Sequence, residues 1–410
     1  MESPSGSAAS SQALAGIRIV DFSAAVVGPY ASKILADRGA EVIKIEAPDG
    51  DVIRWIAGPS PTPGMGGKFM HLNRGKYSVC ADLKKPGAQD FLQRLLKWAD
   101  VIMINMRPQA VERLGLDPAS VWQHNPQLVH CAMVGFGEGP YRNYPAYDSI
   151  IQGASGLASL FALQGSEPNY VPYVVADRTV GLMAANAILM GLMNRYRTGR
   201  GQQVEVPMYE SMAALVMGEH LYGATYEPAL SEPGDLRLID PQARPLPTRD
   251  GYVCLTTNTD QQAFRLMDLI GRPDMRTDPR FANKLARAAH SREYFSIRAE
   301  AMREKTTAQW LVLLREADIP AMAYQDIRGV LEDPHFAGSG VVQMRAHPSE
   351  GMMRELADPI RINGEMGMAE LPAPRLGEHL DRVMGMLGCG AEERDQWLSA
   401  GVLIPPRDNG

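Results

Sequence analysis

Asp177 is a candidate nucleophile, because it stands directly before Arg178, where a helix is predicted to begin. An aspartate has an ordinary pKa of about 3.9, so it is anionic at pH 7, and a helix N-terminus would stabilise that charge further. A free carboxylate can attack an acyl thioester and form a mixed anhydride without an auxiliary base. The simpler interpretation is an N-cap, a position that Asp prefers. However, Val180 stands where the Glu or Gln of a capping box would be.

Other short segments are incomplete versions of known binding or catalytic motifs. The run Gly135 to Gly139 follows an apolar stretch, but Pro140 stands where a dinucleotide-binding helix would begin, so a plain turn is expected. Lys68 and Lys76 follow glycines without the rest of a P-loop. The eight histidines show no HExxH spacing, no GxSxG motif occurs, and we expect no metal site.

The charge balance of this 410-residue chain limits its partners. There are 41 Lys and Arg against 47 Asp and Glu, a formal net charge of −6. Nucleic-acid binding is therefore disfavoured, and an anionic ligand needs a local cluster of cations. The four cysteines lie far apart without a CxxC pair, which favours a reducing cytoplasm. We expect neither a membrane-spanning helix nor a secretory signal.

Short apolar runs alternate with helical patterns through the first half of the chain. This alternation predicts an α/β fold with a parallel sheet and right-handed crossovers. One helical run, Val180 to Met193, is apolar on nearly every face and predicts a buried helix. The predicted strands are 17–22, 41–46, 78–83, 101–106, 128–134 and 203–206.

Composition divides the chain into segments. Residues 1–13 form a polar tail that we expect to be disordered, and 14–225 hold the α/β pattern. Residues 226–250 are rich in proline and predict a linker, followed by a smaller α+β domain over 251–330. Residues 331–410 contain further scattered Gly, Pro and Met residues, with a predicted helix near 391–399.

A set of short motifs runs through nearly the whole chain. They are Val20-Asp21-Phe22, Gly28-Pro29, Gly39 to Glu46, Leu72 to Lys76, Ala81 to Lys84, Asn105, Arg107-Pro108, Glu112 to Leu116, Tyr147-Asp148, Ala176-Asp177, Thr198 to Gln202 and Pro372 to His379. No single one of these motifs identifies a family. Their order and spacing together resemble the family III CoA-transferases, which include formyl-CoA:oxalate CoA-transferase, carnitine CoA-transferase and α-methylacyl-CoA racemase.

The resemblance implies a fold and an oligomeric state. It implies a large Rossmann-like CoA-binding domain built from both chain ends, 14–225 and 331–410, with the smaller domain inserted between them. It also implies a ring-shaped monomer in an interlocked homodimer. Coenzyme A and acyl-CoA would be substrates, and Asp177 would be the catalytic aspartate.

The resemblance also assigns residues to coenzyme A binding. Lys84 and Arg113 match positions that meet the nucleotide phosphates. Asn105 lies at the end of a predicted strand, in the region where such sheets bind ligands. The simpler interpretation of Lys84 and Arg113 is that they are solvated surface charges.

This sequence departs from the family pattern in ways that bear on its substrate. Ala47 stands in place of an arginine that some members have, so phosphate binding would depend on other groups such as Lys76 or Arg107. Val26 replaces a glutamine of the formyl-CoA enzymes, which argues against oxalate and formate. Pro241 to Asp250 has no counterpart of the glycine-rich loop that shields the intermediate from water.

Tyr147 distinguishes two chemistries. The racemases carry a histidine at this position, which forms a proton-transfer pair with the aspartate. A tyrosine with a pKa near about 10 is a poor base at neutral pH. Acyl transfer is therefore favoured over racemisation, although a packed aromatic residue is the simpler interpretation of Tyr147.

The sequence thus predicts a cytoplasmic acyl-CoA:carboxylate CoA-transferase that works through an aspartyl mixed anhydride and an aspartyl-CoA thioester. One alternative is an α-methylacyl-CoA epimerase that uses Asp177 and an unidentified partner. Another is a CoA-binding protein without catalytic activity. An NAD-dependent dehydrogenase is a more distant alternative, because the dinucleotide fingerprint is incomplete.

Overall fold

The computed structural model describes residues 12–406, so the predicted disordered tail lies almost entirely outside the described residues. The chain divides into two compact units. The first takes residues from both ends of the chain: those up to Ala154, Pro172–Met212 and those from His335 onward. The second consists of Ser155–Val171 and Ala213–Pro334.

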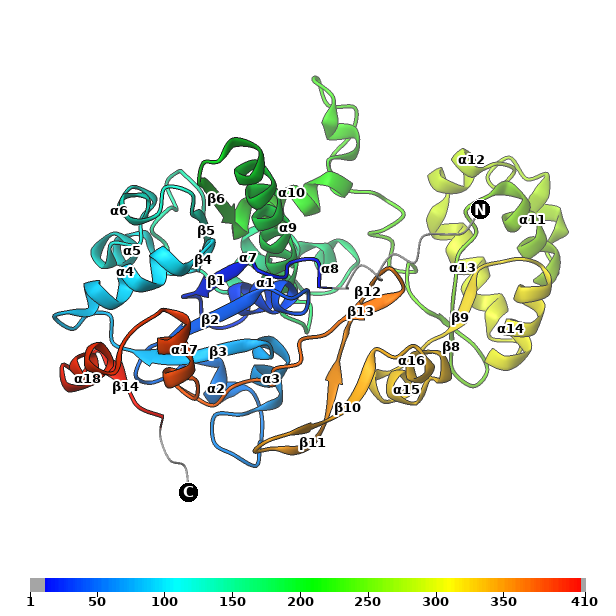
Figure 1. The fold of residues 1–410 in the computed structure, drawn as a ribbon. Coiled ribbons are helices and arrows are strands. Elements are labelled where there is room, and N and C mark those ends of the chain that lie inside the picture. The colour runs from blue at the N-terminus through cyan, green and yellow to red at the C-terminus, as the bar shows by residue number, and fades with distance from the viewer. Residues whose placement is uncertain (1–11, 407–410) are drawn as a thin grey trace, which may run out of the picture. The chain divides into compact units, whose positions relative to one another are not determined.

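A seven-stranded sheet organises the first unit (Figure 1). Its order is β14-β3-β2-β1-β4-β5-β6, and every neighbouring pair is parallel except β14 with β3. The parallel part follows the 3-2-1-4-5-6 order of doubly wound nucleotide-binding sheets, which confirms the predicted parallel α/β fold. The strands are β1 (Arg18–Asp21), β2 (Glu41–Glu46), β3 (Lys76–Ala81), β4 (Val101–Ile104), β5 (Val129–Val134), β6 (Gln202–Pro207) and β14 (Leu403–Ile404).

Helices pack against this sheet, and its central strands β1, β2, β4 and β5 are buried along nearly their whole length. Helix α4 (Ala88–Trp98) places Phe91, Leu92, Leu95 and Leu96 at helical spacing against one face, each at most 3% exposed. Other helices of the unit are α1 (Val27–Ala36), α2 (Ile53–Ile56), α3 (Gly67–Asn73), α5 (Pro108–Leu114), α6 (Pro118–His124), α7 (Asp148–Ala154), α17 (Leu380–Met386) and α18 (Ala391–Ser399).

Helix α9 (Val175–Thr198) packs on α1 and on β6, and only one of its faces is buried. A Cβ at Gly181 would lie 2.8 Å from the carbonyl oxygen of Val27, so the close approach of the two helices requires glycine here. The opposite face is exposed, as Met190 at 66% and Met193 at 62% show. The prediction of a wholly buried helix was therefore wrong. By length and composition alone, α9 is also apolar enough to cross a membrane.

The C-terminal part of the first unit contains two hairpins that the sequence did not indicate. They are β10 (Val342–His347) with β11 (Gly351–Leu356), and β12 (Asp358–Ile362) with β13 (Glu365–Gly367). The buried pair of Arg38 and Asp358, 2.5 Å apart, ties these hairpins to the N-terminal segment. The first compact unit is therefore assembled from both ends of the chain.

The second unit is α+β. Its antiparallel sheet has the order β7-β8-β9, and a core that includes Leu266, Met302 and Trp310 lies against it. Its elements include α8 (Ser159–Leu163), most of α10 (Met208–His220), β7 (Leu246–Pro247), β8 (Tyr252–Leu255), α11 (Asp260–Leu269), α12 (Lys284–Ala289), α13 (Ser291–Met302), α14 (Thr307–Glu316), β9 (Ala321–Ala323) and α15 (Ile327–Glu332); α16 (Pro334–Gly338) follows.

Candidate active site

A cavity of about 190 Å³ lies where the chain leaves the carboxyl ends of the central strands of the first unit. Strands β1 and β4 are neighbours, and β1 leads to β2 on one side of the sheet whereas β4 leads to β5 on the other. This switch point is where doubly wound sheets bind ligands. The cavity brings together these predicted site residues: Val26, Asn105, Arg107, Tyr147 and Asp177.

Asp177 lies half-buried in the first turn of α9 and lines this cavity. Its carboxylate accepts no hydrogen bond from any residue that the structure describes. Instead, Asp148 caps the helix: its Oδ1 accepts from the backbone N–H of Ala176 at 2.8 Å and of Asp177 at 3.1 Å. The N-cap interpretation of Asp177 was therefore wrong, and the helix begins at Val175, before the predicted start.

The environment of Asp177 raises its pKa to about 6. Burial is the largest cause, the negative charge of Asp148 adds to it, and the nearby cations Lys68 and Arg178 oppose both. Nothing in the sequence indicated this burial or the nearby Asp148 charge, which together outweigh the nearby cations and keep the pKa above its ordinary value. At pH 7 the carboxylate is still mostly ionised, and it is poorly solvated, which suits a nucleophile.

The loop between β1 and α1 is held rigidly beside this cavity. The side-chain amide of Asn105 donates to the carbonyl of Ala24 at 2.8 Å and accepts from its N–H at 3.0 Å. Ala25 has a φ of +66°, which is rare for a residue with a side chain, and its N–H donates to Asp51 at 2.9 Å. Asn105 thus lines the cavity while its amide positions the loop that carries Val26.

Gly28 of the Gly28-Pro29 motif is required by this same loop. A Cβ at position 28 would lie 2.0 Å from the hydroxyl oxygen of Ser23, so any larger residue would displace the loop. Lys44 also fixes this loop. Its ammonium donates to the carbonyl of Ser23 at 2.9 Å and pairs with Asp51 at 2.9 Å. Gly28 and Lys44, which belong to two of the sequence motifs, therefore hold the loop that forms part of the cavity wall.

Lys76 cannot bind phosphate in this structure, which corrects the prediction. Its side chain is 0% exposed, and its ammonium contacts Asp21 at 3.4 Å, Asn73 at 2.8 Å and the carbonyl of Pro29 at 2.9 Å. Burial alone would raise the pKa of Asp21. The cations Lys76 and Lys44 nevertheless hold that pKa below its ordinary value. Burial lowers the pKa of Lys76 itself to about 7, although Asp21 opposes this, so Lys76 is a buried structural group and not a ligand-binding cation.

Three other predicted cations remain available to a ligand. Lys84 follows β3, Arg113 lies on α5, and Arg107 precedes that helix and lines the cavity; all three are exposed. None of them forms an ion pair with a residue that the structure describes. They lie along the carboxyl edge of the sheet, where anionic groups of a ligand are expected.

Comparison with known proteins identifies the family. A sequence profile described as CoA-transferase family III matches residues 14–380. The chain belongs to CoA-transferase family III.

Named relatives of this family III CoA-transferase extend over most of its length. It is 31% identical to the succinate–glutarate CoA-transferase of Agrobacterium fabrum, over 91% of this chain and 95% of the relative. It is 30% identical to the probable fatty acyl-CoA transferase Rv3272 of Mycobacterium tuberculosis, over 89% and 96% respectively.

Solved structures agree with the fold. An aspartate-to-alanine mutant of Rv3272 superposes with a TM-score of 0.78 at 30% identity, covering 90% of this chain and 97% of that chain. A CAIB/BAIF family protein from Brucella suis gives a TM-score of 0.76 at 28% identity, covering 92% and 99%.

The side chain of Tyr147 is 72% exposed, so the packed-aromatic interpretation was wrong. Tyr144 beside it, at 59% exposed, also lines the cavity, and together they form an aromatic rim. Asp148, the other member of the Tyr147-Asp148 motif, is occupied: besides capping α9 it accepts from Gln152 at 2.7 Å. This pair therefore supplies a rim and a cap to the CoA-transferase.

Sequence reasoning missed several residues of the site. Arg142 lines the cavity and pairs with Glu205 at 2.7 Å, and nothing local in the sequence marked it. Lys68, which the sequence marks only as part of an incomplete P-loop, is one of the cations near Asp177. Arg178 stands next to Asp177 in the sequence, and its guanidinium lies 4.3 Å from the ring centre of Tyr30. Adjacency to Asp177 was the one available signal for Arg178.

Proposed function

We propose that this family III CoA-transferase moves coenzyme A from an acyl-CoA donor to a carboxylic acid acceptor, with Asp177 as the nucleophile. The observation that carries the proposal is the free carboxylate of Asp177. It faces a cavity at the sheet's switch point, while Asp148 performs the capping that would otherwise occupy it. A carboxylate needs no base to attack a thioester.

The steps balance without any other reactant. A carboxylate oxygen of Asp177 attacks the thioester carbon, the C–S bond breaks, and CoA thiolate leaves an acyl-aspartyl anhydride. The thiolate attacks the aspartyl carbonyl, which releases the donor acid and forms aspartyl-CoA. The acceptor carboxylate then displaces the thiolate to give a second anhydride. The thiolate attacks the acceptor acyl carbon of that anhydride, which yields acceptor-CoA and regenerates Asp177.

The site offers groups for coenzyme A as well as for the reaction. The exposed cations Lys84, Arg107 and Arg113 come after β3 and β4 of the same sheet, and we assign them to the phosphates. The names of the relatives point to dicarboxylates or fatty acids as acceptors. We therefore propose succinyl-CoA as the first donor to test, with glutarate and medium-chain acids as acceptors.

Trapping the intermediate tests this proposal. We expect incubation with succinyl-CoA, followed by borohydride or hydroxylamine, to modify Asp177 in a peptide that mass spectrometry identifies. The Asp177→Asn variant should show neither the adduct nor transfer. An adduct on another residue, or full transfer by Asp177→Asn, would contradict the assignment.

The same samples separate transfer from epimerisation. An epimerase needs a second proton-transfer group, and Asp177 is the sole carboxylate among the described residues that line the cavity, which include no histidine. We expect no solvent deuterium to enter the α-carbon of a branched acyl-CoA. Deuterium uptake without CoA exchange would support the epimerase instead, and tight CoA binding without turnover would support a non-catalytic protein.

We further propose that the enzyme is a homodimer that uses the exposed face of α9. Apolar side chains on this face are unusually exposed for a soluble helix, so a second copy would bury them. They are Leu182, Leu189, Met190 and Met193, at 40–66% exposed. Sedimentation of the wild type should give a dimer, and Met190→Glu should shift it to a monomer; a monomeric wild type would refute this point.

A further inference from the structure

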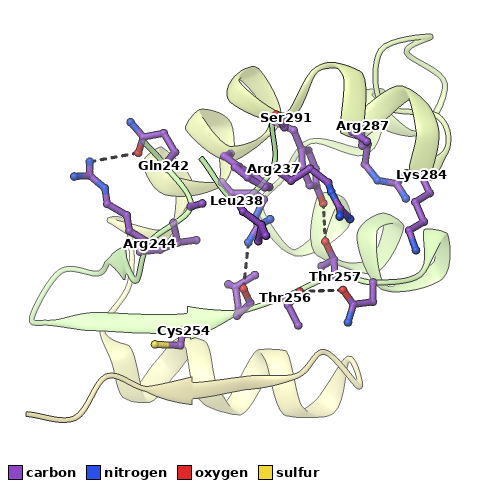
Figure 2. Close-up of a pocket in the computed structure, with 18 of the residues that line it drawn as sticks. Arg237, Leu238, Gln242, Arg244, Cys254, Thr256, Thr257, Lys284, Arg287 and Ser291 are labelled. Carbon is purple, nitrogen blue, oxygen red and sulfur yellow. Dashed lines mark hydrogen bonds between the residues drawn. The ribbon is translucent and has the colours of Figure 1, made fainter. Parts of the chain in front are cut away.

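The second compact unit contains a larger cavity, of about 720 Å³, that the transfer reaction does not use. It lies between the segment 237–246, strand β8 and helices α12 and α13 (Figure 2). Its lining includes several apolar and hydroxyl side chains but no carboxylate. Its cationic side chains are Arg237, Arg244, Lys284, Arg287 and Arg298.

Two of these cations are already neutralised by neighbours. Arg237 pairs with Asp235 at 2.6 Å, and Arg287 pairs with Asp260. The other three have no ion pair among the residues that the structure describes. Figure 2 shows Arg244 at one end of the cavity and Lys284 at the other, and both are exposed. The cavity therefore carries a net positive charge in a protein whose formal net charge is −6.

Arg298 is the unusual member, because it is only 7% exposed and lacks an anion. Its guanidinium lies 5.3 Å from the ring of Tyr294 and 5.1 Å from that of Phe295, and Nη2 donates to the carbonyl of Leu255 at 3.3 Å. Its Nε is buried and has no hydrogen-bond partner. Burial lowers the pKa of Arg298. A buried charge with an unsatisfied donor lowers the stability of the fold unless a ligand supplies the missing anion or acceptor.

The apolar side of the lining indicates what kind of anion would fit. Leu238, Leu246 and Leu255 line the cavity together with the rings beside Arg298. A highly charged, strongly hydrated phosphate would gain little from these side chains, whereas a hydrocarbon body would bury apolar surface there. The hidden guanidinium provides one positive charge in the interior, which matches one carboxylate.

We propose that this cavity binds a carboxylic acid with an apolar body, whose carboxylate pairs with Arg298. The exposed Arg244 and Lys284 attract the anion toward the cavity, and the leucines hold its hydrocarbon chain. The site belongs to a different compact unit from Asp177, and it takes no part in the anhydride chemistry.

Calorimetry with the full-length wild type tests the ligand class. Propionate, hexanoate and decanoate probe the effect of chain length, and coenzyme A provides the phosphate-bearing alternative. We expect affinity to rise from propionate to decanoate. Hydrogen exchange should then show that decanoate protects α13 and β8, and that coenzyme A does not. Protection by coenzyme A alone, or by neither ligand, would overturn the proposal.

Substitutions on α13 test the residue. Arg298→Met should weaken decanoate binding about tenfold or more, because a charged hydrogen bond is lost. Arg292→Met is the matched control, since Arg292 lies exposed on the same helix outside the cavity lining, and it should bind like the wild type. Equal affinities in these two variants would refute the role of Arg298.

Two further variants keep the outcome interpretable. If Arg298→Met does not fold, Arg298→Lys keeps the positive charge and should bind decanoate with intermediate affinity; wild-type affinity in it would count against the geometry. Asp177→Asn should keep the decanoate-dependent protection of α13. A failure of the trapping experiment at Asp177 is therefore independent of a failure here.

Discussion

The buried charges beneath the β1–α1 loop contrast with the carboxylate of Asp177. Lys44, Asp51, Asp21 and Lys76 have side chains at most 1% exposed, and each has an opposite charge within 3.4 Å. Asp177 is half-buried, and no residue within 12–406 forms an ion pair with it. Paired charges fix a backbone conformation, whereas an unpaired one keeps its reactivity and lowers stability.

The largest expected effect is on catalysis. Asp177→Asn should lower kcat/KM for CoA transfer by about 10⁴-fold, because the amide cannot form the anhydride. Asp90→Asn is the control, since Asp90 lies exposed on α4. Steady-state kinetics with succinyl-CoA measures both. Comparable rates for the two variants would show that the unpaired carboxylate is not the nucleophile.

The next effect should appear in stability. Lys76→Met removes the cation in contact with Asp21 and leaves Lys44 as the remaining cationic neighbour of this buried carboxylate, so we expect the free energy of unfolding to fall by about 3 kcal/mol. Urea denaturation measures it, with Lys97→Met, at an exposed position on α4, as the unchanged control. If the Lys76 variant unfolds at the wild-type urea concentration, the pairing does not support the loop.

Asp177→Asn should also stabilise the protein at neutral pH. The folded pKa is about 6, above the ordinary value for aspartate, so ionisation of Asp177 lowers stability, and this loss is complete above pH 6 and disappears as the pH falls toward 4. We expect a gain of about 1–2 kcal/mol at pH 7.5 and almost none at pH 4. Urea midpoints at both pH values measure it. A pH-independent gain would mean that Asp177 is not held in an unfavourable ionised state.

Asp148 both caps α9 and raises the pKa of Asp177, and two substitutions separate these effects. Asp148→Ala removes the acceptor of two backbone N–H groups and should cost about 1 kcal/mol of stability. Asp148→Asn keeps an acceptor oxygen but removes the charge that raises the pKa of Asp177, so the acidic limb of the kcat/KM profile should move to lower pH. A shift to higher pH would contradict the assigned electrostatics.

The smallest effects should come from the exposed cations. Lys84→Gln and Arg113→Gln should each raise KM for the acyl-CoA about threefold and leave kcat unchanged, because solvent-exposed ion pairs are weak. The rise should shrink at high salt. Kinetics at two ionic strengths measures it, and a fall in kcat instead would place these residues nearer the chemistry.

Local sequence signals predicted much of the large sheet. The run that became β5 is mostly apolar and buried, and the run that became β2 carries Val42, Ile43 and Ile45 between its charged residues, so both patterns are visible without knowing any neighbour. The hairpin of β10 and β11 was missed because most of its residues are exposed or half-exposed, which leaves little alternation to detect. The outer face of α9 was misjudged because an apolar sequence does not say what covers it.

The sequence by itself determined the kinds of group available: a carboxylate at a helix start, cations after the strands, and the ordered motifs of the family. Only the tertiary structure decided which of these groups stay free. Lys76 is sequestered by Asp21, 55 positions away, and Asp177 is spared from capping by Asp148, 29 positions away. Burial and pairing depend on such distant contacts, and they set the charge and reactivity of each side chain.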